Sequence, residues 1–159
     1  MDEESKAKFF QLIRTQKNAS LGTTLQGQPL VSMVLYSASS DLTSYAIHIS
    51  QLAQHTQNIM NDPRVSLMIC ESVRKGINPQ TLARISIMGK AMLLSSMSTE
   101  YAAAKESYLA KYPFAKMNFQ LGDFSMYAIK LEAVRYVAGF GKAFRLTPAD
   151  IEALARAEA

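Results

Sequence analysis

The sequence contains no tryptophan, one cysteine and two histidines. Cys70 therefore has no partner for an internal disulfide, and one cysteine with two histidines cannot complete a four-ligand structural zinc site. Seven glycines and five prolines are too few for a low-complexity or disordered chain. A hydrophobic core must hold the 159 residues, and a chain of this length buries about 70% of its unfolded surface. We expect a single domain over residues 1–159 and no metal site.

Long apolar runs are also missing. No stretch reaches the roughly 18 apolar residues that span a bilayer, and residues 1–18 lack the apolar core of a secretory signal. We therefore expect a cytoplasmic protein with no membrane partner. The net charge is +4, and basic residues are spread from Lys6 to Arg156 without a cluster. Nucleic-acid binding needs a clustered basic face, so no nucleic-acid partner is expected, and the weak charge better suits anionic small molecules.

Motifs of cofactor-independent catalysis are absent as well. The sequence has no glycine-rich phosphate loop, no G-x-S-x-G nucleophile elbow and no H-E-x-x-H pair. No two carboxylates stand out as an acid–base couple. Cys70 lies among apolar residues of a predicted strand, as a packed thiol does, and Glu71 beside it is expected on the surface. The catalytic residues stay unknown, and any redox chemistry would come from a bound cofactor.

What is present is the order of elements of a mainly β protein with helical additions. Helical spacing of apolar residues predicts a helix in residues 1–18, and capping residues predict helices over 98–112 and 147–159. Alternating patterns predict strands over 20–26, 30–37, 43–50, 64–71 and 83–95, a short helix over 51–62 and a final strand pair within 124–141. This order indicates an antiparallel barrel or sandwich.

Each predicted strand has an apolar face and a face of small polar or cationic side chains. In residues 43–50, the second face carries Ser44, Ala46, His48 and Ser50. One interpretation is the solvated outer surface that most antiparallel sheets have. The other is a ligand-binding face, because serine side chains cover little of a sheet and leave room for a bound molecule.

The segment from His48 to Asn58 runs from a strand directly into a helix, with Ser50 placed to cap that helix. Unpaired backbone N–H groups and the helix dipole make such an N-terminus suitable for a phosphate. His55 flanks the predicted apolar stripe of the helix and could reach a bound anion. The alternative is an N-capped structural helix with a surface histidine.

Four segments in this order resemble a known family. They are SLGTTLQGQPLVSMVLYS, HISQLAQHTQNIMNDPRVSLMICE, ARISIMGKA and DFSMYAIKLEAVRYVAGFGKA, within about residues 20–146. The sequence resembles the pyridoxamine 5′-phosphate oxidase-like FMN-binding split barrels. Within them it is most similar to the haem-utilisation (HugZ-type) branch, whose S-x-L-A-x-H-T-x-N and D-P-R-x-S-L motifs it carries. The resemblance implies a six-stranded antiparallel Greek-key split β-barrel, and a homodimer with two FMN sites at its interface.

The resemblance also implies which residues bind the cofactor. Ser32 to Val34 would line the flavin and ribityl chain, and Ser50 would meet the phosphate or ribityl hydroxyls. His55 stands where the oxidases have a phosphate-binding lysine, and Arg84, in place of a glutamine, would pair with the phosphate. Glycines 139 and 141 predict a tight turn by themselves, and the resemblance places it near the partner's flavin. The implied set is Ser32, Met33, Val34, Ser50, His55, Thr56, Asn58, Arg84, Gly139, Phe140 and Gly141.

The sequence departs from the oxidases at two substrate-binding positions. Lys142-Ala143-Phe144 stands where they carry an Arg-x-His pair, and Ser37 stands where they carry a lysine. Pyridoxamine-phosphate oxidase activity itself is therefore not expected. No histidine follows His55, whereas the haem-degrading members use one in a C-terminal extension.

Three hypotheses remain open, because a fold does not fix a function. The first is an FMN-binding flavoprotein that acts as an oxidoreductase on an unknown small molecule with an unknown electron donor. The second is a haem-binding or haem-utilisation protein on the same barrel, with His48 or His55 reaching the haem. The third is a non-catalytic module that carries or senses a cofactor.

Overall fold

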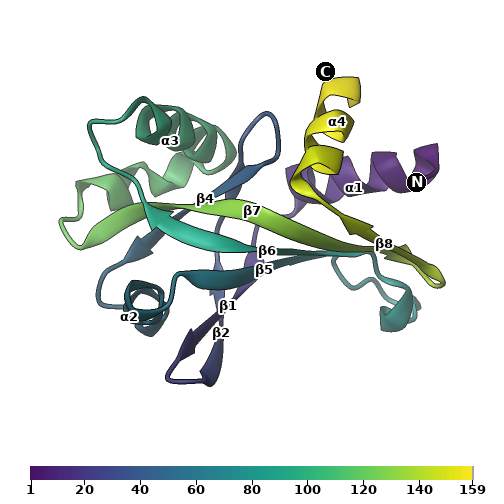
Figure 1. The fold of residues 1–159 in the computed structure, drawn as a ribbon, viewed down its shortest axis with the longest axis horizontal. Helices are drawn as coiled ribbons and strands as arrows, with labels where there is room; N and C mark the ends of the chain where they lie inside the picture. The colour runs from purple at the N-terminus through teal and green to yellow at the C-terminus, as the bar shows by residue number, and fades with distance from the viewer. Residues whose placement is uncertain (159) are drawn as a thin grey trace.

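The computed structural model describes residues 1–158, which fold around one antiparallel sheet (Figure 1). The strands lie in the order β2-β1-β5-β6-β7-β4-β3, and β8 pairs with β7. The mainly β architecture with helical additions is confirmed, but the sheet has eight strands rather than six. The strands are β1 (Ala19–Leu25), β2 (Gln28–Val34), β3 (Ser37–Ala38), β4 (Ser44–Ser50), β5 (Arg64–Cys70), β6 (Arg84–Leu93), β7 (Phe124–Gly139) and β8 (Lys142–Leu146). The helices are α1 (Glu3–Thr15), α2 (Gln54–Asn61), α3 (Thr99–Lys111) and α4 (Pro148–Glu158), with short 3₁₀ helices η1 (Pro79–Thr81) and η2 (Pro113–Gln120).

β2 and β3 follow one another in the chain but lie at opposite ends of the strand order. The sequence predicts one strand over 30–37, whereas the structure ends β2 at Val34 and places Tyr36 in a crossing segment. Distant partners hold Tyr36 there. Its hydroxyl donates to Ile13 O (2.9 Å), and its N–H donates to the Tyr112 hydroxyl (3.3 Å). The barrel is therefore open between β2 and β3.

β7 is the longest strand and joins the two parts of the sheet. The sequence predicts a strand pair within 124–141, but the structure has one 16-residue strand there. β7 pairs with β6 along one edge and with β4 and then β8 along the other. The second strand of the pair is β8, which follows the predicted turn. Gly139 (φ 155°) and Gly141 (φ 78°) supply the positive backbone angles of that turn.

Two hydrophobic cores lie on opposite faces of β4. The larger core fills the barrel and includes Phe9 and Ile13 of α1, which are at most 3% exposed. The smaller core lies between β4, β7 and α3, around Tyr108. Ala46 and His48 are on the face that the sequence assigns to solvent or a ligand, and both are buried against this second core. The second core forms because α3 and η2 pack over that face (Figure 1).

Capping side chains begin α3 and α4, the two helices predicted in the second half of the chain. Ser98 Oγ accepts the Tyr101 N–H (3.1 Å) before α3, and Thr147 and Asp150 bond reciprocally before α4. The predicted terminal helices are found as α1 and α4, and the last position of the predicted C-terminal helix, 159, lies outside the described residues. Within residues 1–158, every helix is too short or too polar to cross a bilayer.

Candidate functional site

A serine–histidine pair lies at the open edge of the sheet. Ser32 is on β2, the strand at one end of the sheet, and His55 is in the first turn of α2, which packs beside β1 and β2. The Ser32 Oγ and the His55 Nδ1 are 3.1 Å apart. His55 Nε2 is covered by protein and has no hydrogen-bond partner within residues 1–158. The structure thus brings together two of the residues that the resemblance implies.

Burial lowers the pKa of the His55 imidazole below its usual value. The ring is therefore neutral at pH 7, with a proton on one nitrogen and a lone pair on the other. When the proton is on Nδ1, the ring donates to Ser32 Oγ and the lone pair is on Nε2. A neutral imidazole is a good metal ligand, and toward a phosphate it offers an N–H donor without a positive charge.

Ser50 does not cap α2, contrary to the sequence prediction. The helix begins at Gln54, and its N-cap is Ala53, which has no side-chain oxygen. Ser50 Oγ instead accepts the Leu52 N–H (3.1 Å) and donates to Asp123 Oδ2 (2.7 Å). The turn that these bonds stabilise delays the start of the helix. The first turn of α2 is thus left without a capping side chain.

Thr56 and Asn58 hold α2 in place. Thr56 Oγ1 donates to Ser50 O (2.6 Å), and Asn58 Nδ2 donates to Thr23 Oγ1 on β1 (3.0 Å). Both side chains are at most 2% exposed. Val34, another residue of the implied set, is also buried, in the larger core. Contact of these three side chains with a cofactor stays a prediction, and the structure gives each of them a packing role.

Arg84 lies at the other end of the sheet from α2. It pairs with Cys70, the last residue of β5, whereas α2 leads into Arg64, the first residue of that strand. The register sets Ser32 level with Leu67, three residues before Cys70, and three strand spacings separate β2 from β6, so the Cα atoms of Ser32 and Arg84 are roughly 17 Å apart. The Arg84 guanidinium donates to Leu82 O (3.0 Å). Within one chain Arg84 and His55 are therefore too far apart to share a phosphate, and their predicted joint role would require a second copy.

The glycine turn lies at the same end of the sheet as Arg84. Arg84 pairs with Val137 on β7, two residues before the strand ends at Gly139. Phe140, between the two glycines, is 84% exposed. In one chain the turn is thus remote from the Ser32–His55 pair, and its predicted contact with a partner's flavin stays a prediction.

Met33 belongs to an exposed apolar strip on the outer face of the sheet. Strand alternation points it away from Ser32, and Met33 and Val31 are 69% and 70% exposed. The strand register aligns two rows across β2, β1 and β5, namely Met33, Ser20 and Met68, then Val31, Gly22 and Ser66. The small residues in the middle of each row make this strip flat, and we refer to it as the outer strip.

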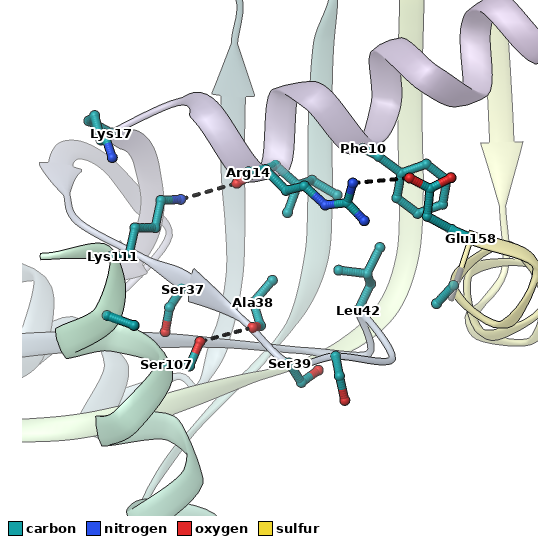
Figure 2. Close-up of a pocket in the computed structure, with 14 residues that line it drawn as sticks. Phe10, Arg14, Lys17, Ser37, Ala38, Ser39, Leu42, Ser107, Lys111 and Glu158 are labelled. Atoms are coloured by element: carbon teal, nitrogen blue, oxygen red, sulfur yellow. Dashed lines mark hydrogen bonds and ion pairs between the residues drawn. The ribbon is translucent and has the colours of Figure 1, made fainter.

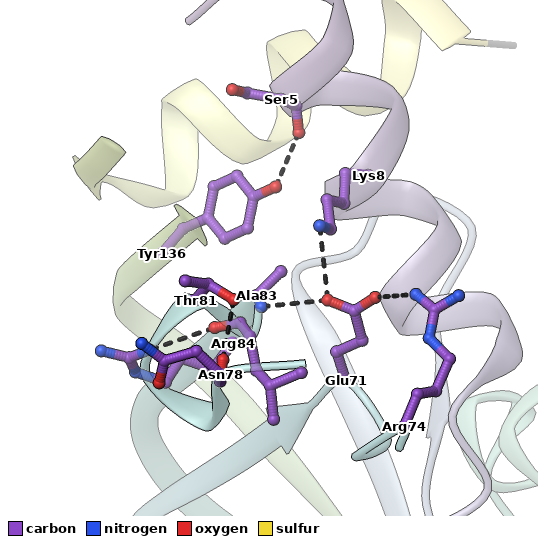
Figure 3. A network of polar contacts seen from close by, with 10 residues as sticks. Ser5, Lys8, Glu71, Arg74, Asn78, Thr81, Ala83, Arg84 and Tyr136 are labelled. Carbon is purple, nitrogen blue, oxygen red and sulfur yellow. Dashed lines mark hydrogen bonds and ion pairs between the residues drawn. The ribbon is translucent and has the colours of Figure 1, made fainter. Parts of the chain in front are cut away.

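Glu71, which is predicted on the surface, is partly buried there. Its side chain is 17% exposed and forms ion pairs with Lys8 of α1 (3.3 Å) and with Arg74 (2.7 Å) (Figure 3). Burial raises the pKa of Glu71, but the Ala83 N–H (3.2 Å), Arg74 and Lys8 outweigh burial and hold the pKa below its usual value. Through these contacts the carboxylate links α1 to the loop that precedes β6. No short motif could reveal this role, because Lys8 is far away in sequence.

A sheet that is open between β2 and β3, with a helix beside the open edge, defines a split barrel of the pyridoxamine 5′-phosphate oxidase-like class. The family described as CREG, beta-barrel matches residues 3–152. The chain belongs to this family. The predicted resemblance to the split barrels and their haem-utilisation branch is confirmed.

Several relatives are described as haem proteins. The chain is 35% identical over 139 residues to the non-canonical heme oxygenase HOZ, chloroplastic, of Arabidopsis thaliana, a match over 83% of this chain and 41% of that protein. A heme-binding protein from Mycobacterium smegmatis superposes with a TM-score of 0.83 at 26% identity, over 96% of this chain and 61% of that one. HutZ, a heme storage protein of Vibrio cholerae, has a TM-score of 0.72 at 21% identity, over 79% and 89% of the two chains. The chain spans less than two thirds of the first two relatives, and the likeness to HutZ shows the fold alone.

Proposed function

We propose that the protein binds haem at the open edge of β2, with His55 Nε2 as an iron ligand. The observation that carries this proposal is the state of His55: the ring is neutral, Ser32 holds its Nδ1, and its Nε2 has no partner within residues 1–158. The protein covers Nε2 in this conformation, so the ring must turn outward for iron to reach it, and ligation would then recover the free energy that the unpartnered atom costs. Ser32 would orient the ring, as hydrogen-bond partners do for metal-bound histidines. Bound haem would supply an iron centre for small ligands.

The surroundings of the pair favour haem over a flavin phosphate. Burial lowers the pKa of His55 and so disfavours a positive charge there, and Arg84 lies three strands away from Ser32. The Asp123 carboxylate, bonded to Ser50 just before α2, repels an anion there. The Arabidopsis and Mycobacterium relatives are described by haem chemistry or haem binding. Because the chain covers only part of each, the proposal is limited to binding haem.

The test is a spectroscopic titration of the purified protein with haemin. The chain has two histidines, so His55→Ala removes the proposed ligand, while His48→Phe keeps a ring stacked on Phe119 and is the matched control. We expect a Soret band for the wild-type protein and for His48→Phe. For His55→Ala we expect at least a tenfold loss of affinity and a shifted Soret band, with added imidazole restoring the wild-type spectrum.

Either of two results would overturn the proposal outright, and a third would reassign the ligand. One is an unchanged Soret position and affinity in His55→Ala. The other is a wild-type protein that takes up no haemin at all. Loss of haemin binding in His48→Phe with retention in His55→Ala would move the ligand to the other histidine and would also refute the assignment.

FMN is the second candidate, because the first turn of α2 has no capping side chain and could accept a phosphate on its backbone N–H groups. The protein would then be an FMN-dependent oxidoreductase of an unknown small molecule. The protein is titrated with FMN and with riboflavin. If it quenches the fluorescence of FMN but hardly that of riboflavin, and gives no Soret band with haemin, then FMN replaces haem as the proposed cofactor. Binding of either cofactor with no turnover would favour the non-catalytic module.

We also propose that two copies pair through the outer strip. Its apolar side chains, led by Val31 and Met33, are exposed, and the small residues between them allow a second sheet to approach closely. Burial of such flat apolar surface is the main favourable contribution to association.

A further inference from the structure

A cavity, which we call the first cavity, lies on the opposite side of the molecule from α2. Its volume is about 580 Å³, within the range of small-molecule sites. α1, α3, α4 and the segment from Ser37 to Leu42 enclose it (Figure 2). This segment leads into the first residue of β4, whereas α2 follows the last, and β4 is about 20 Å long. The cavity is therefore separate from the Ser32–His55 pair.

Three cations converge on this cavity. They are Arg14, Lys17 and Lys111, and the single carboxylate in the lining, Glu158, is bonded to Arg14 (3.0 Å). The Lys111 Nζ donates to Ile13 O (3.1 Å) and forms no ion pair within residues 1–158. Burial first, and then the charge of Lys17, lower the pKa of Lys111 to about 8. An anion placed between the two lysines would relieve their mutual repulsion.

The floor beneath these cations is apolar. Phe10, Ile13 and Leu42 line it, and the exposed Ala110 forms part of the rim. The hydroxyl of Ser37, which is 2% exposed, also borders the cavity and has no hydrogen-bond partner within residues 1–158. The site thus combines an apolar floor with a cationic side and a spare hydroxyl.

A neighbouring cavity has acidic rather than cationic side chains in its lining. It has a volume of about 540 Å³ and shares the segment from Ser37 to Ser40, Ser107 and Ala110 with the first cavity. Its own charged lining residues are Glu106 and Glu100, and Glu100 forms an ion pair with Lys130. An anionic molecule that enters this region would therefore favour the first cavity and avoid the second.

The structure assigns to the first cavity, as our own proposal, the binding of an amphipathic carboxylate. The carboxylate lies between Lys17 and Lys111, with Arg14 at its side, and the apolar body lies on Phe10, Ile13 and Leu42. Arg and Lys donors on a carboxylate give charge-assisted hydrogen bonds, and the aliphatic body is removed from water by the floor.

The experiment is a calorimetric titration of the full chain with octanoate, and with 1-octanol as the uncharged analogue. We expect saturable binding of octanoate and at least tenfold weaker binding of octanol. Lys17→Gln, at an exposed position, should weaken octanoate binding at least threefold, and Ala110→Trp should abolish it by filling the rim. Lys75→Gln removes an equal charge from an exposed loop and should leave the affinity unchanged.

Octanoate binding that survives in Ala110→Trp, or that falls equally in Lys17→Gln and Lys75→Gln, would overturn the assignment. Equal binding of octanol and octanoate, or no binding of octanoate, would do so as well. Circular dichroism of Ala110→Trp confirms that the fold is kept. The titration is repeated in His55→Ala, which should bind octanoate as the wild-type protein does, so that failure at this cavity is distinguished from failure at the haem site.

Discussion

His48 is a buried, neutral side chain in the smaller core. Its ring stacks on Phe119 with a centroid distance of 3.8 Å and an interplanar angle of 6°. Burial, and next the charge of Lys105, lower the pKa of His48 to about 4. Its Nδ1 has no hydrogen-bond partner within the described chain. Protonation would therefore place an uncompensated charge between aromatic rings.

We predict that the protein loses stability as the pH falls from about 6.5 to 4. The folded state binds a proton at His48 less readily than the unfolded state, so the contribution is complete above the unfolded pKa and is lost below it. The loss by pH 4 is roughly 2–3 kcal/mol. Urea unfolding at pH 7.5, 5.5 and 4.5 measures it.

His48→Phe is the comparison for this prediction and should show a shallower pH dependence. His55→Gln should remove a separate, smaller part, because burial lowers the pKa of His55 in the same direction. A wild-type protein whose unfolding free energy does not change between pH 7.5 and 4.5 would contradict the prediction.

At the scale of residues, the sequence is a good guide to local contacts and a poor one to distant contacts. Ser98 and Thr147 are predicted as helix caps and act as caps, because the bonded groups lie within three positions. Ser50 is predicted as a cap and is not one, because Asp123 and a following turn compete for its hydroxyl. The ion pair of Glu71 with Lys8 is missed for the same reason, since Lys8 belongs to another element.

At the scale of elements, Gly89 allows β6 and β7 to approach at their bulge. The register between the two strands skips Glu132 at this point. A Cβ added at Gly89 would overlap the Lys130 carbonyl oxygen and lie 2.9 Å from its carbon. Backbone cannot move aside as a flexible side chain does. Glycine is required here by close contact and not by a positive φ.

We predict that Gly89→Ala destabilises the fold by about 3 kcal/mol or more, because the strands must separate or shift register. Gly122→Ala is the matched control, since a Cβ there meets no atom within 4 Å, and it should change stability by about 0.5 kcal/mol or less. Urea unfolding followed by circular dichroism compares the two variants. Equal midpoints would show that the bulge tolerates a side chain.

Most elements could be predicted from the sequence, and the errors have a common cause. Alternation and caps locate α1, α3, α4, β5 and β6 to within a few residues. The long β7 is misread as a pair because its alternation of apolar and polar residues changes phase at the bulge. The face of β4 is misread because small residues there are covered by α3, which no local pattern reveals. Of the implied cofactor residues, Ser32 and His55 lie together and Arg84 lies apart from them within one chain, and their contact with a cofactor stays a prediction.

At the scale of the whole molecule, the outer strip predicts a dimer. Size-exclusion chromatography with light scattering should give twice the 17.6 kDa chain mass. Met33→Glu places a charge in the middle of the strip and should give a monomer, because an unpaired buried charge opposes association. Met97→Glu is the control at a residue that is 93% exposed outside the strip. A monomeric wild-type protein, or a dimeric Met33→Glu variant, would refute the interface.

β7 pairs with β4, β6 and β8, and this arrangement sets the order in which the chain can fold during synthesis. Ser44 pairs with Lys130, more than half the chain later. Until residues 124–139 leave the ribosome, β4 has only β3 and β6 has only β5 as a partner, and contacts as distant in sequence as those with β7 form slowly. The nascent chain must therefore expose a strand edge and apolar side chains until β7 is made, and incomplete chains of this kind are prone to aggregate.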